Sequence, residues 1–344
     1  MTKKTFYNFT LFDGAGDQNT PDAWFTVDTD TGKITACGTG HPDTADEQVD
    51  LHGQYVMPGF INVHTHITSN PDSFSGSFGA SESESAVFGY ENLQKLLKSG
   101  VTYIRQCGAT YDVDIKLKRL QRDGILPHTP HIMASGRAFS MTGGHGDGRN
   151  SAYLVDSPDE MRKGVRQAFK AGAECIKVMA TGGVMTPNDF MEDPQLSVPE
   201  MHVAVEEAHH KRRIVAAHAE GNPGIQNALD AGVDAIDDTY HNLKRAFEIG
   251  VKFTCGTDAG TPFNGFDRTP DEFGLLTKVG MTPAQAYQCS SINSATLLGV
   301  ADDYGTLEVG KHADFQVLRA DPLADTAAVK QADKGVYVGG IQQF

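Results

Sequence analysis

Residues 59–67 read GFINVHTHI, an apolar run that ends in two histidines, His64 and His66. The residues before them, QYVMPGFINV (54–63), have the composition of a buried strand. Side chains two residues apart on a strand point to the same side, so we expect the two imidazoles to lie close together. Such a pair is either a hydrogen-bonded pair in the core or half of a metal site, and the spacing alone leaves both interpretations open.

Strand-like and helix-like segments alternate along the chain that follows this stretch. Several predicted helices end at a glycine followed by the valine of the next strand, as in KSGVTY (98–103) and EIGVKF (248–253). Repeated units of this kind predict an α/β fold, a TIM-type (β/α)8 barrel. The predicted strands are 56–64, 101–107, 131–135, 174–180, 213–218, 233–236 and 251–256, and the predicted helices are 86–99, 112–124, 158–171, 199–211, 222–231, 240–249 and 283–298.

The two ends of the chain have a different pattern, with short strand-like segments separated by turns. KTFYNFTLFDG (4–14) and GTLEVGKHADFQVL (305–318) are examples. We therefore predict a small β-sandwich domain made from residues 1–57 and 303–344, and a barrel domain from residues 58–302.

The number of predicted strands falls one short of a complete barrel. Ile236 and Val251 are separated by residues 237–250, which have room for only one helix. A βαβ unit needs about 30 residues. We therefore expect a barrel that lacks one βα unit near residues 237–239, either deleted from the chain or missing from the sequence as given.

The composition excludes several classes of partner. The chain has 344 residues and a formal net charge of −15, and its Lys and Arg residues form no stripe, so nucleic acid is not an expected partner. No run approaches the roughly 18 apolar residues of a membrane span. The start lacks an apolar signal region, and the five dispersed cysteines fit reduced core residues, so we expect a cytoplasmic protein. We also expect a homo-oligomer acting on a small molecule.

Polar residues stand at the predicted carboxyl ends of the strands, where barrel enzymes carry their chemistry. They are His64 and His66, Lys177, His218 and Asp258. Taken singly, His218 fits a core histidine, Lys177 a partner for a buried carboxylate, and Asp258 a turn or helix-cap residue. Burying all these groups without partners would cost several kcal/mol, and divalent cations would compensate them together.

Six stretches resemble the amidohydrolase superfamily, in particular its imidazolonepropionase-like enzymes and metal-dependent Xaa-Pro dipeptidases. The resemblance implies a barrel with a β-sandwich and one or two divalent metal ions, usually zinc. It implies that His64, His66 and Asp258 hold one ion, that Lys177, carboxylated on its amine, bridges to a second, and that His218 binds the second. The stretches are VMPGFINVHTH (56–66), SMTGGHGD (140–147), ECIKVMATGGV (174–184), AAHAEG (216–221), GTDAGTPF (256–263) and LEVGKHADFQVL (307–318).

The implied reaction is hydrolysis of a small amide, a dipeptide such as Xaa-Pro or an N-acyl amino acid, by a metal-activated hydroxide. Asp258 takes the proton of the hydroxide and delivers it to the leaving amine. Lys177 and His145 complete the predicted catalytic residues; His145, on a Gly-rich loop, faces the substrate, and Arg137 pairs with a substrate carboxylate. The alternatives are hydrolysis of a cyclic amide and a catalytically impaired barrel that only binds ligands.

The chain departs from the family pattern after the sixth predicted strand. The family has another histidine there, whereas DAIDDTYHN (234–242) has Asp238 at that position. The nearest histidine, His241, lies in a segment that matches a barrel helix, and we do not expect it to be a ligand. The missing ligand and the missing βα unit therefore fall at the same place.

Overall fold

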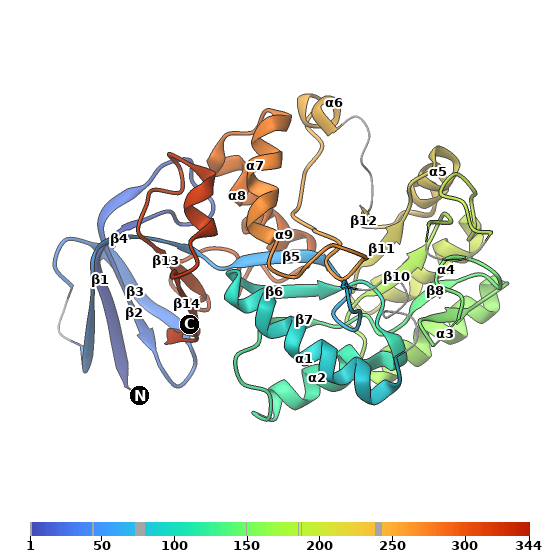
Figure 1. The fold of residues 1–344 in the computed structure, drawn as a ribbon, viewed down its shortest axis with the longest axis horizontal. Helices are drawn as coiled ribbons and strands as arrows, with labels where there is room; N and C mark the ends of the chain where they lie inside the picture. The colour runs from blue at the N-terminus through green and yellow to red at the C-terminus, as the bar shows by residue number, and fades with distance from the viewer. Residues whose placement is uncertain are drawn as a thin grey trace.

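The computed structural model describes residues 2–42, 45–72, 80–148, 150–184, 186, 188–237 and 243–344. Figure 1 shows a β-sheet at one end of the molecule and, beside it, parallel strands with helices packed outside them. Both chain ends belong to the sheet, and the middle of the chain forms the second part. This arrangement agrees with the predicted fold class.

Strands from both ends of the chain share one seven-stranded sheet, in the order β15-β14-β13-β4-β1-β2-β3. Strand β4 joins the two ends, because it pairs with β1 on one side and with β13 on the other. Aromatic rings fill the core of this sheet; Phe315 lies 5.1 Å from Phe6 and 4.4 Å from Tyr337 between ring centroids. The strands are β1 (Lys3–Leu11), β2 (Thr20–Asp28), β3 (Lys33–Thr39), β4 (Glu47–Pro58), β13 (Phe315–Leu318), β14 (Gly335–Val338) and β15 (Ile341–Gln342).

The chain passes from this sheet into the barrel through Gly59, the single residue between β4 and β5. A Cβ atom on Gly59 would lie 2.1 Å from the Thr102 hydroxyl, so only glycine fits here. Parallel strands follow in two sheets, β5-β6-β7 and β12-β11-β10-β8-β9. They are β5 (Phe60–Thr65), β6 (Val101–Gln106), β7 (His131–Met133), β8 (Ala138–Ser140), β9 (Ala152–Leu154), β10 (Ile176–Met179), β11 (Val215–His218) and β12 (Ala235–Asp237).

Helices cover the outside of these strands (Figure 1). Ser157 begins the third of them as predicted, because its side chain accepts a hydrogen bond from the backbone N–H of Glu160. The helices are α1 (Glu82–Lys98), α2 (Val113–Arg122), α3 (Pro158–Ala171), α4 (Val198–His209), α5 (Asn222–Ala231), α6 (Leu243–Glu248), α7 (Thr269–Val279), α8 (Pro283–Cys289) and α9 (Ile292–Leu297), with 3-10 turns η2 (Thr110–Asp112) and η3 (Thr326–Lys330).

The predicted helix over 283–298 is two helices, α8 and α9, and α7 was not predicted. The serines between α8 and α9 explain why the helix is interrupted, because their hydroxyls form hydrogen bonds to backbone carbonyls and so favour a non-helical backbone there. The Ser291 hydroxyl donates to the carbonyls of Gly14 and Tyr287, and the Ser290 hydroxyl donates to that of Ile61. Helix α7 begins with Thr269-Pro270, a start signal that sequence analysis could have used.

The predicted strand over 251–256 is wrong, since the structure assigns no strand there. The segment still follows β5: Val63 N–H donates to the Cys255 carbonyl at 2.9 Å, and Asp258 N–H donates to the His64 carbonyl at 3.0 Å. Between Asp237 and Val251 the described residues contain α6 and no further strand. The segment therefore has β5 as a neighbour on one side, and the predicted missing βα unit would have supplied the neighbour on the other.

The rest of the predicted gap lies outside the described residues, as do Asp238 and His241.

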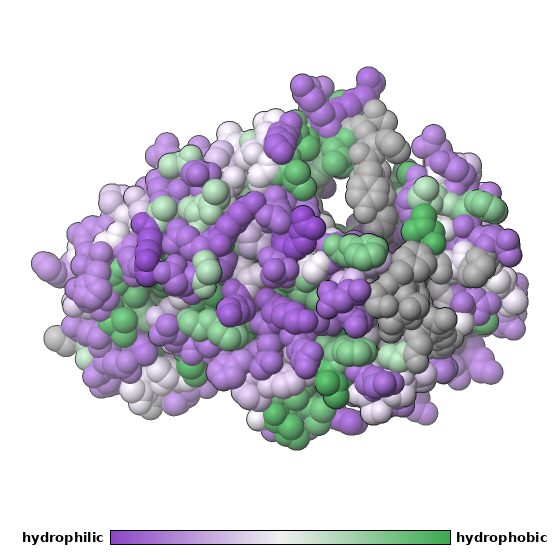
Figure 2. All heavy atoms as spheres, viewed as in Figure 1, coloured by the Kyte–Doolittle hydropathy of each residue, from purple (hydrophilic) through white to green (hydrophobic). Residues whose placement is uncertain are grey.

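Hydrophilic residues dominate the face shown in Figure 2, with hydrophobic residues in several small groups. Among the described residues, no helix has the length and apolar character needed to span a membrane.

Candidate metal centre

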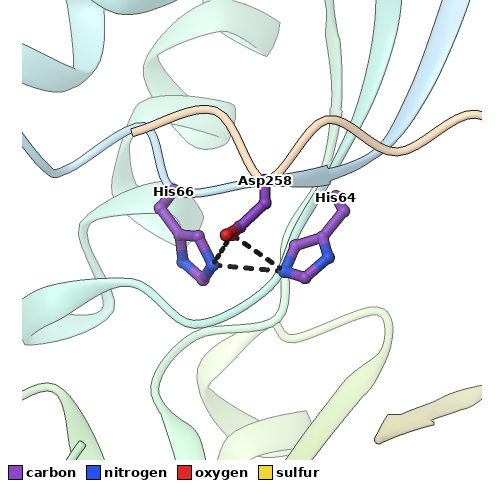
Figure 3. Close-up of side chains that lie close together, drawn as sticks. All are labelled: His64, His66 and Asp258. Carbon is purple, nitrogen blue, oxygen red and sulfur yellow. Dashed lines mark hydrogen bonds and ion pairs between the residues drawn. The ribbon is translucent and has the colours of Figure 1, made fainter. Parts of the chain in front are cut away.

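Three of the predicted metal ligands converge at the carboxyl end of β5. His64 lies on this strand, His66 follows its last residue, Thr65, and Asp258 comes from the segment that follows Cys255 (Figure 3). Asp258 Oδ1 lies 3.4 Å from His64 Nε2 and 3.1 Å from His66 Nε2, and the two imidazole nitrogens are 3.2 Å apart. The alternation of side chains along β5 therefore brings both histidines to one side, as the sequence predicted.

The backbone around these residues holds them in place. Asn62, fully buried, accepts a hydrogen bond from the backbone N–H of His64, and its amide donates to the Thr257 hydroxyl at 2.7 Å. This contact fixes the segment before Asp258 against β5. Gly256 permits the close approach, because a Cβ atom there would lie 2.8 Å from His64 Cβ.

The donor set fits a divalent cation. Ligand atoms bound tetrahedrally at 2.0–2.2 Å are separated by about 3.3 Å, which is the spacing of His64, His66 and Asp258 here. Two imidazoles and one carboxylate leave a fourth position open, as in catalytic rather than structural sites. His66 Nδ1 faces the Gly108 carbonyl at 3.4 Å, which directs Nε2 toward the cluster.

Lys177 lies on β10 and is buried, with 2 % of its side chain exposed. Its amine is 2.7 Å from Asp237 Oδ2, and Asp237 Oδ1 is 2.8 Å from Arg105 Nη2. The lysine therefore pairs with a buried carboxylate, the simpler of its two interpretations. Asp237 Oδ2 also lies 4.0 Å from His64 Nδ1, so this group of charges adjoins the His64, His66 and Asp258 cluster.

Sequence analysis missed Asp237, Arg105 and Cys107. A second possible ligand group consists of His64, Cys107 and Asp237, whose ligand atoms all lie within 4.8 Å of one another. The sequence contained one usable signal, because Asp237 stands at the end of a predicted strand next to the position where the family has a histidine. The arginine carried no such signal, since an isolated basic residue in an apolar strand does not reveal its partner.

His218 and His145 stack face to face, with ring centroids 4.5 Å apart and planes inclined by 7°. His218 ends β11, and its Nε2 lies 3.0 Å from the Gly182 carbonyl. His145 lies on the predicted Gly-rich loop, and its Nδ1 is 2.9 Å from Asp189 Oδ2. Burial, followed by the neighbouring His218, lowers the pKa of His145 to about 4.

Arg137 is engaged by residues of its own neighbourhood. Its guanidinium lies 3.2 Å from Asp112 Oδ2 and stacks over the ring of Tyr153 at 3.8 Å. Burial lowers the pKa of Arg137, but the carboxylate of Asp112 raises it, and the net effect is a raised pKa. A role in binding a substrate carboxylate remains a prediction for this residue, which already has one carboxylate partner.

The comparisons with known proteins agree with this architecture. An ochratoxinase from Aspergillus niger is 29% identical over 365 aligned positions, covering 83% of this chain and 75% of the relative. An imidazolonepropionase from Fusobacterium nucleatum is 21% identical over 364 positions, covering 85% of this chain and 84% of the relative. A crystal structure of a Xaa-Pro dipeptidase with bound methionine superposes with a TM-score of 0.90 at 25% identity, covering 99% of both chains.

Both curated alignments are longer than the 344 residues of this chain, so they contain gaps on its side. The family model for the amidohydrolase family matches in two pieces, residues 55–243 and 234–341, which overlap at the segment where the sequence predicts a missing βα unit. The two pieces together span most of the chain. The chain belongs to the amidohydrolase family.

Proposed function

We propose that this protein is a metal-dependent amidohydrolase that cleaves a small amide, a dipeptide such as Xaa-Pro or an N-acyl amino acid. The observation that carries the proposal is the convergence of His64, His66 and Asp258, with ligand atoms 3.1–3.4 Å apart, at the carboxyl end of β5. Family membership supports the reaction class, and the dipeptidase with a TM-score of 0.90 supports a small amide substrate.

A divalent cation held by these three residues, which we propose to be zinc, would supply Lewis acidity and would lower the pKa of a bound water. Asp258 is placed to accept a proton from the attacking water and to deliver it to the leaving amine. Its side chain is 23 % exposed, so it can reach both partners from the rim of the barrel. His145, which contacts Asp189 and stacks on His218, is the proposed substrate-facing residue of the Gly-rich loop.

Lys177 and His218 are the proposed ligands of a second cation. Carboxylation of Lys177 releases two protons, one when its ammonium becomes the neutral amine and one when the amine nitrogen bonds to the carbon of CO2, so an anion replaces a buried cation. The guanidinium of Arg105, which is fully buried and binds the other oxygen of Asp237, contributes a positive charge nearby that favours the anionic form. A neighbouring divalent cation increases this preference.

Two loops that follow predicted ligands in the chain carry exposed apolar side chains. Val184 and Phe190, on the loop that follows β10, are 65 % and 63 % exposed, and Phe263, on the loop that follows Asp258, is 77 % exposed. Loops at the carboxyl ends of barrel strands surround the active site in this fold, and we propose that these side chains contact the substrate. We therefore place amides with an apolar acyl or amino-acid side chain first among the candidates.

The test is a hydrolysis screen of dipeptides and N-acyl amino acids with the purified protein and added zinc or manganese. Turnover that chelation abolishes and metal restores is the expected result, with apolar substrates cleaved fastest. Absence of turnover across the panel with metal bound would reject this substrate class. Absence of bound metal would instead favour the ligand-binding barrel.

Cyclic amides are the second candidate, because imidazolonepropionases are among the curated relatives. Including a cyclic amide such as an imidazolone in the same panel separates the two. Three buried cysteines that form no disulfide with a described residue, Cys175, Cys255 and Cys289, support the proposed reducing, cytoplasmic location. Light scattering of the purified protein would test the proposed homo-oligomer.

A further inference from the structure

We propose that Asp237 is a cation ligand of this barrel and that it completes, with Lys177 and His218, the second subsite. The inference rests on the proposed function, and it assigns to Asp237 the role that a histidine after the sixth strand has in the family. The proposed ligand is Asp237, whereas the sequence comparison put the family's histidine one residue later, at Asp238.

The strand register places Asp237 at the level of the ligands. Strands β11 and β12 are parallel, and His218 is the register partner of Asp237. Side chains at paired positions of neighbouring parallel strands project from the same face of the sheet. Both are buried, at 8 % exposure each, so they lie inside the barrel at the ends of adjacent strands.

The carboxylate is oriented for this role by a partner on another strand. Arg105 on β6 is fully buried, and its Nη2 binds Asp237 Oδ1 at 2.8 Å while its Nε donates to the Val63 carbonyl. This contact occupies one carboxylate oxygen and directs the other, Oδ2, toward Lys177. Residues that hold a metal ligand by its distal oxygen are a common feature of metal centres.

The position of Oδ2 joins the two subsites. It lies 2.7 Å from Lys177 Nζ and 4.0 Å from His64 Nδ1, so it stands between the predicted bridging residue and a ligand of the first cation. In the metal-free chain the Lys177 ammonium compensates the Asp237 charge. Replacement of that ammonium by a carboxylated lysine would leave two anions here, which a divalent cation neutralises.

Cys107 provides the competing assignment. Its thiol sulfur lies 3.9 Å from Asp237 Oδ2, and His64, Cys107 and Asp237 form a second possible ligand group. A cation there would be bound through sulfur, whereas the proposed set contains only nitrogen and oxygen ligands. The two assignments therefore differ in a spectroscopic property as well as in their residues.

The experiment counts metal ions on the folded chain. Metal-free protein is reconstituted with Co²⁺ in the presence of bicarbonate, and bound ions are counted by native mass spectrometry. We expect two ions on the wild-type chain, one on Asp237→Asn, and two on Asp237→His, which restores the residue type of the family. Two ions on Asp237→Asn, or one on the wild-type chain, would overturn the assignment.

Glu207→Gln is the matched control, because Glu207 on α4 is likewise a buried carboxylate between two cations, Arg162 and Arg166. It is expected to keep two ions. If Asp237→Asn fails to fold, the wild-type cobalt spectrum decides: an intense sulfur-to-cobalt charge-transfer band that is lost in Cys107→Ser would overturn the proposed ligand set, and its absence supports it.

The outcomes also separate this inference from the proposed function. Two ions on the wild-type chain and one on Asp237→Asn, without hydrolysis of any amide, would uphold the ligand assignment and reject the function. Hydrolysis by a wild-type chain that binds a single ion would uphold the function and reject the assignment.

Discussion

At the scale of single residues, Asp258 combines a backbone conformation with a chemical role. Its φ of 54° lies in the left-handed region, which aspartate and asparagine tolerate better than most residues. The Asn264 amide donates to the Asp258 carbonyl at 3.0 Å and stabilises this conformation. The residue type therefore serves the turn as well as the site, and the two roles can be separated by a conservative substitution.

Asp258→Asn keeps the shape of the side chain and suits the same backbone conformation, but it cannot take up a proton. We expect kcat for amide hydrolysis to fall by about 100-fold or more, the usual contribution of a general acid–base residue. Thermal unfolding of the metal-free protein should be unchanged. The exposed Asp267→Asn, nearby on the chain, is the control, and equal activity losses in the two variants would contradict the assigned role.

At the scale of elements, the loop from Thr181 to Ser197 is tied to the Gly-rich loop through one buried carboxylate. Asp189 accepts hydrogen bonds from the Gly183 backbone N–H and the Gln195 amide, and it lies 2.9 Å from His145 Nδ1. Only 2 % of its side chain is exposed. The side chain therefore couples the loop that follows β10 to the Gly-rich loop that carries His145.

Removing this contact should loosen both loops without emptying the metal centre. For Asp189→Ala we expect KM to rise by about tenfold, the equivalent of about 1.4 kcal/mol, with metal content unchanged. Limited proteolysis should cut the loop after β10 faster than in the wild-type protein. The exposed Asp193→Ala is the control, and an unaltered KM with unaltered proteolysis in Asp189→Ala would refute the coupling.

At the scale of the whole molecule, Lys334 joins the seven-stranded sheet region to the barrel. Its amine donates to the Ser99 carbonyl at the end of α1 and to the Val329 carbonyl in η3, and it lies 5.6 Å from the centre of the Phe60 ring. No carboxylate pairs with it in the part of the chain that the structure describes. Burial lowers the pKa of Lys334 from 10.5 to about 7.

This shift makes the stability of the fold depend on pH. Between pH 7 and 10.5 the unfolded chain binds a proton on Lys334 that the folded chain lacks, so raising the pH stabilises the fold. Relative to Lys334→Met, the free energy of unfolding of the wild-type protein should rise by on the order of 1 kcal/mol per pH unit from pH 7 to 10. Urea titrations check this, with Lys330→Met as the exposed control; a difference that stays constant with pH would disprove it.

The mass of the purified protein tests whether the chain lacks one βα unit. The mass of the sequence is 37.0 kDa, and we expect intact-mass spectrometry of the purified protein to give this value. A βα unit with its connecting helix would add about 5 kDa. A mass larger by that amount would show that the natural chain carries the absent unit, and it would remove the reason for Asp237 to act as a substitute ligand.

Local patterns in the sequence determined much of this protein. The alternation of side chains in GFINVHTHI put His64 and His66 on one side of a strand, and glycine followed by valine marked where helices end and strands begin. The number of predicted strands and the short segment 237–250 predicted a barrel that lacks one βα unit. These properties follow from the period of a strand or helix and from backbone preferences, which neighbouring residues alone decide.

Only the tertiary structure decided which charges meet. Arg105, Lys177 and Asp237 come from three strands, and their pairing depends on the register between β11 and β12 and on the closure of the barrel. The failure of 251–256 to form a strand has the same origin, since a strand requires the edge of a neighbour as well as suitable residues. The sequence carries the ligand types, but the distances between them arise when distant strands pack together, because no local preference encodes a contact across the barrel.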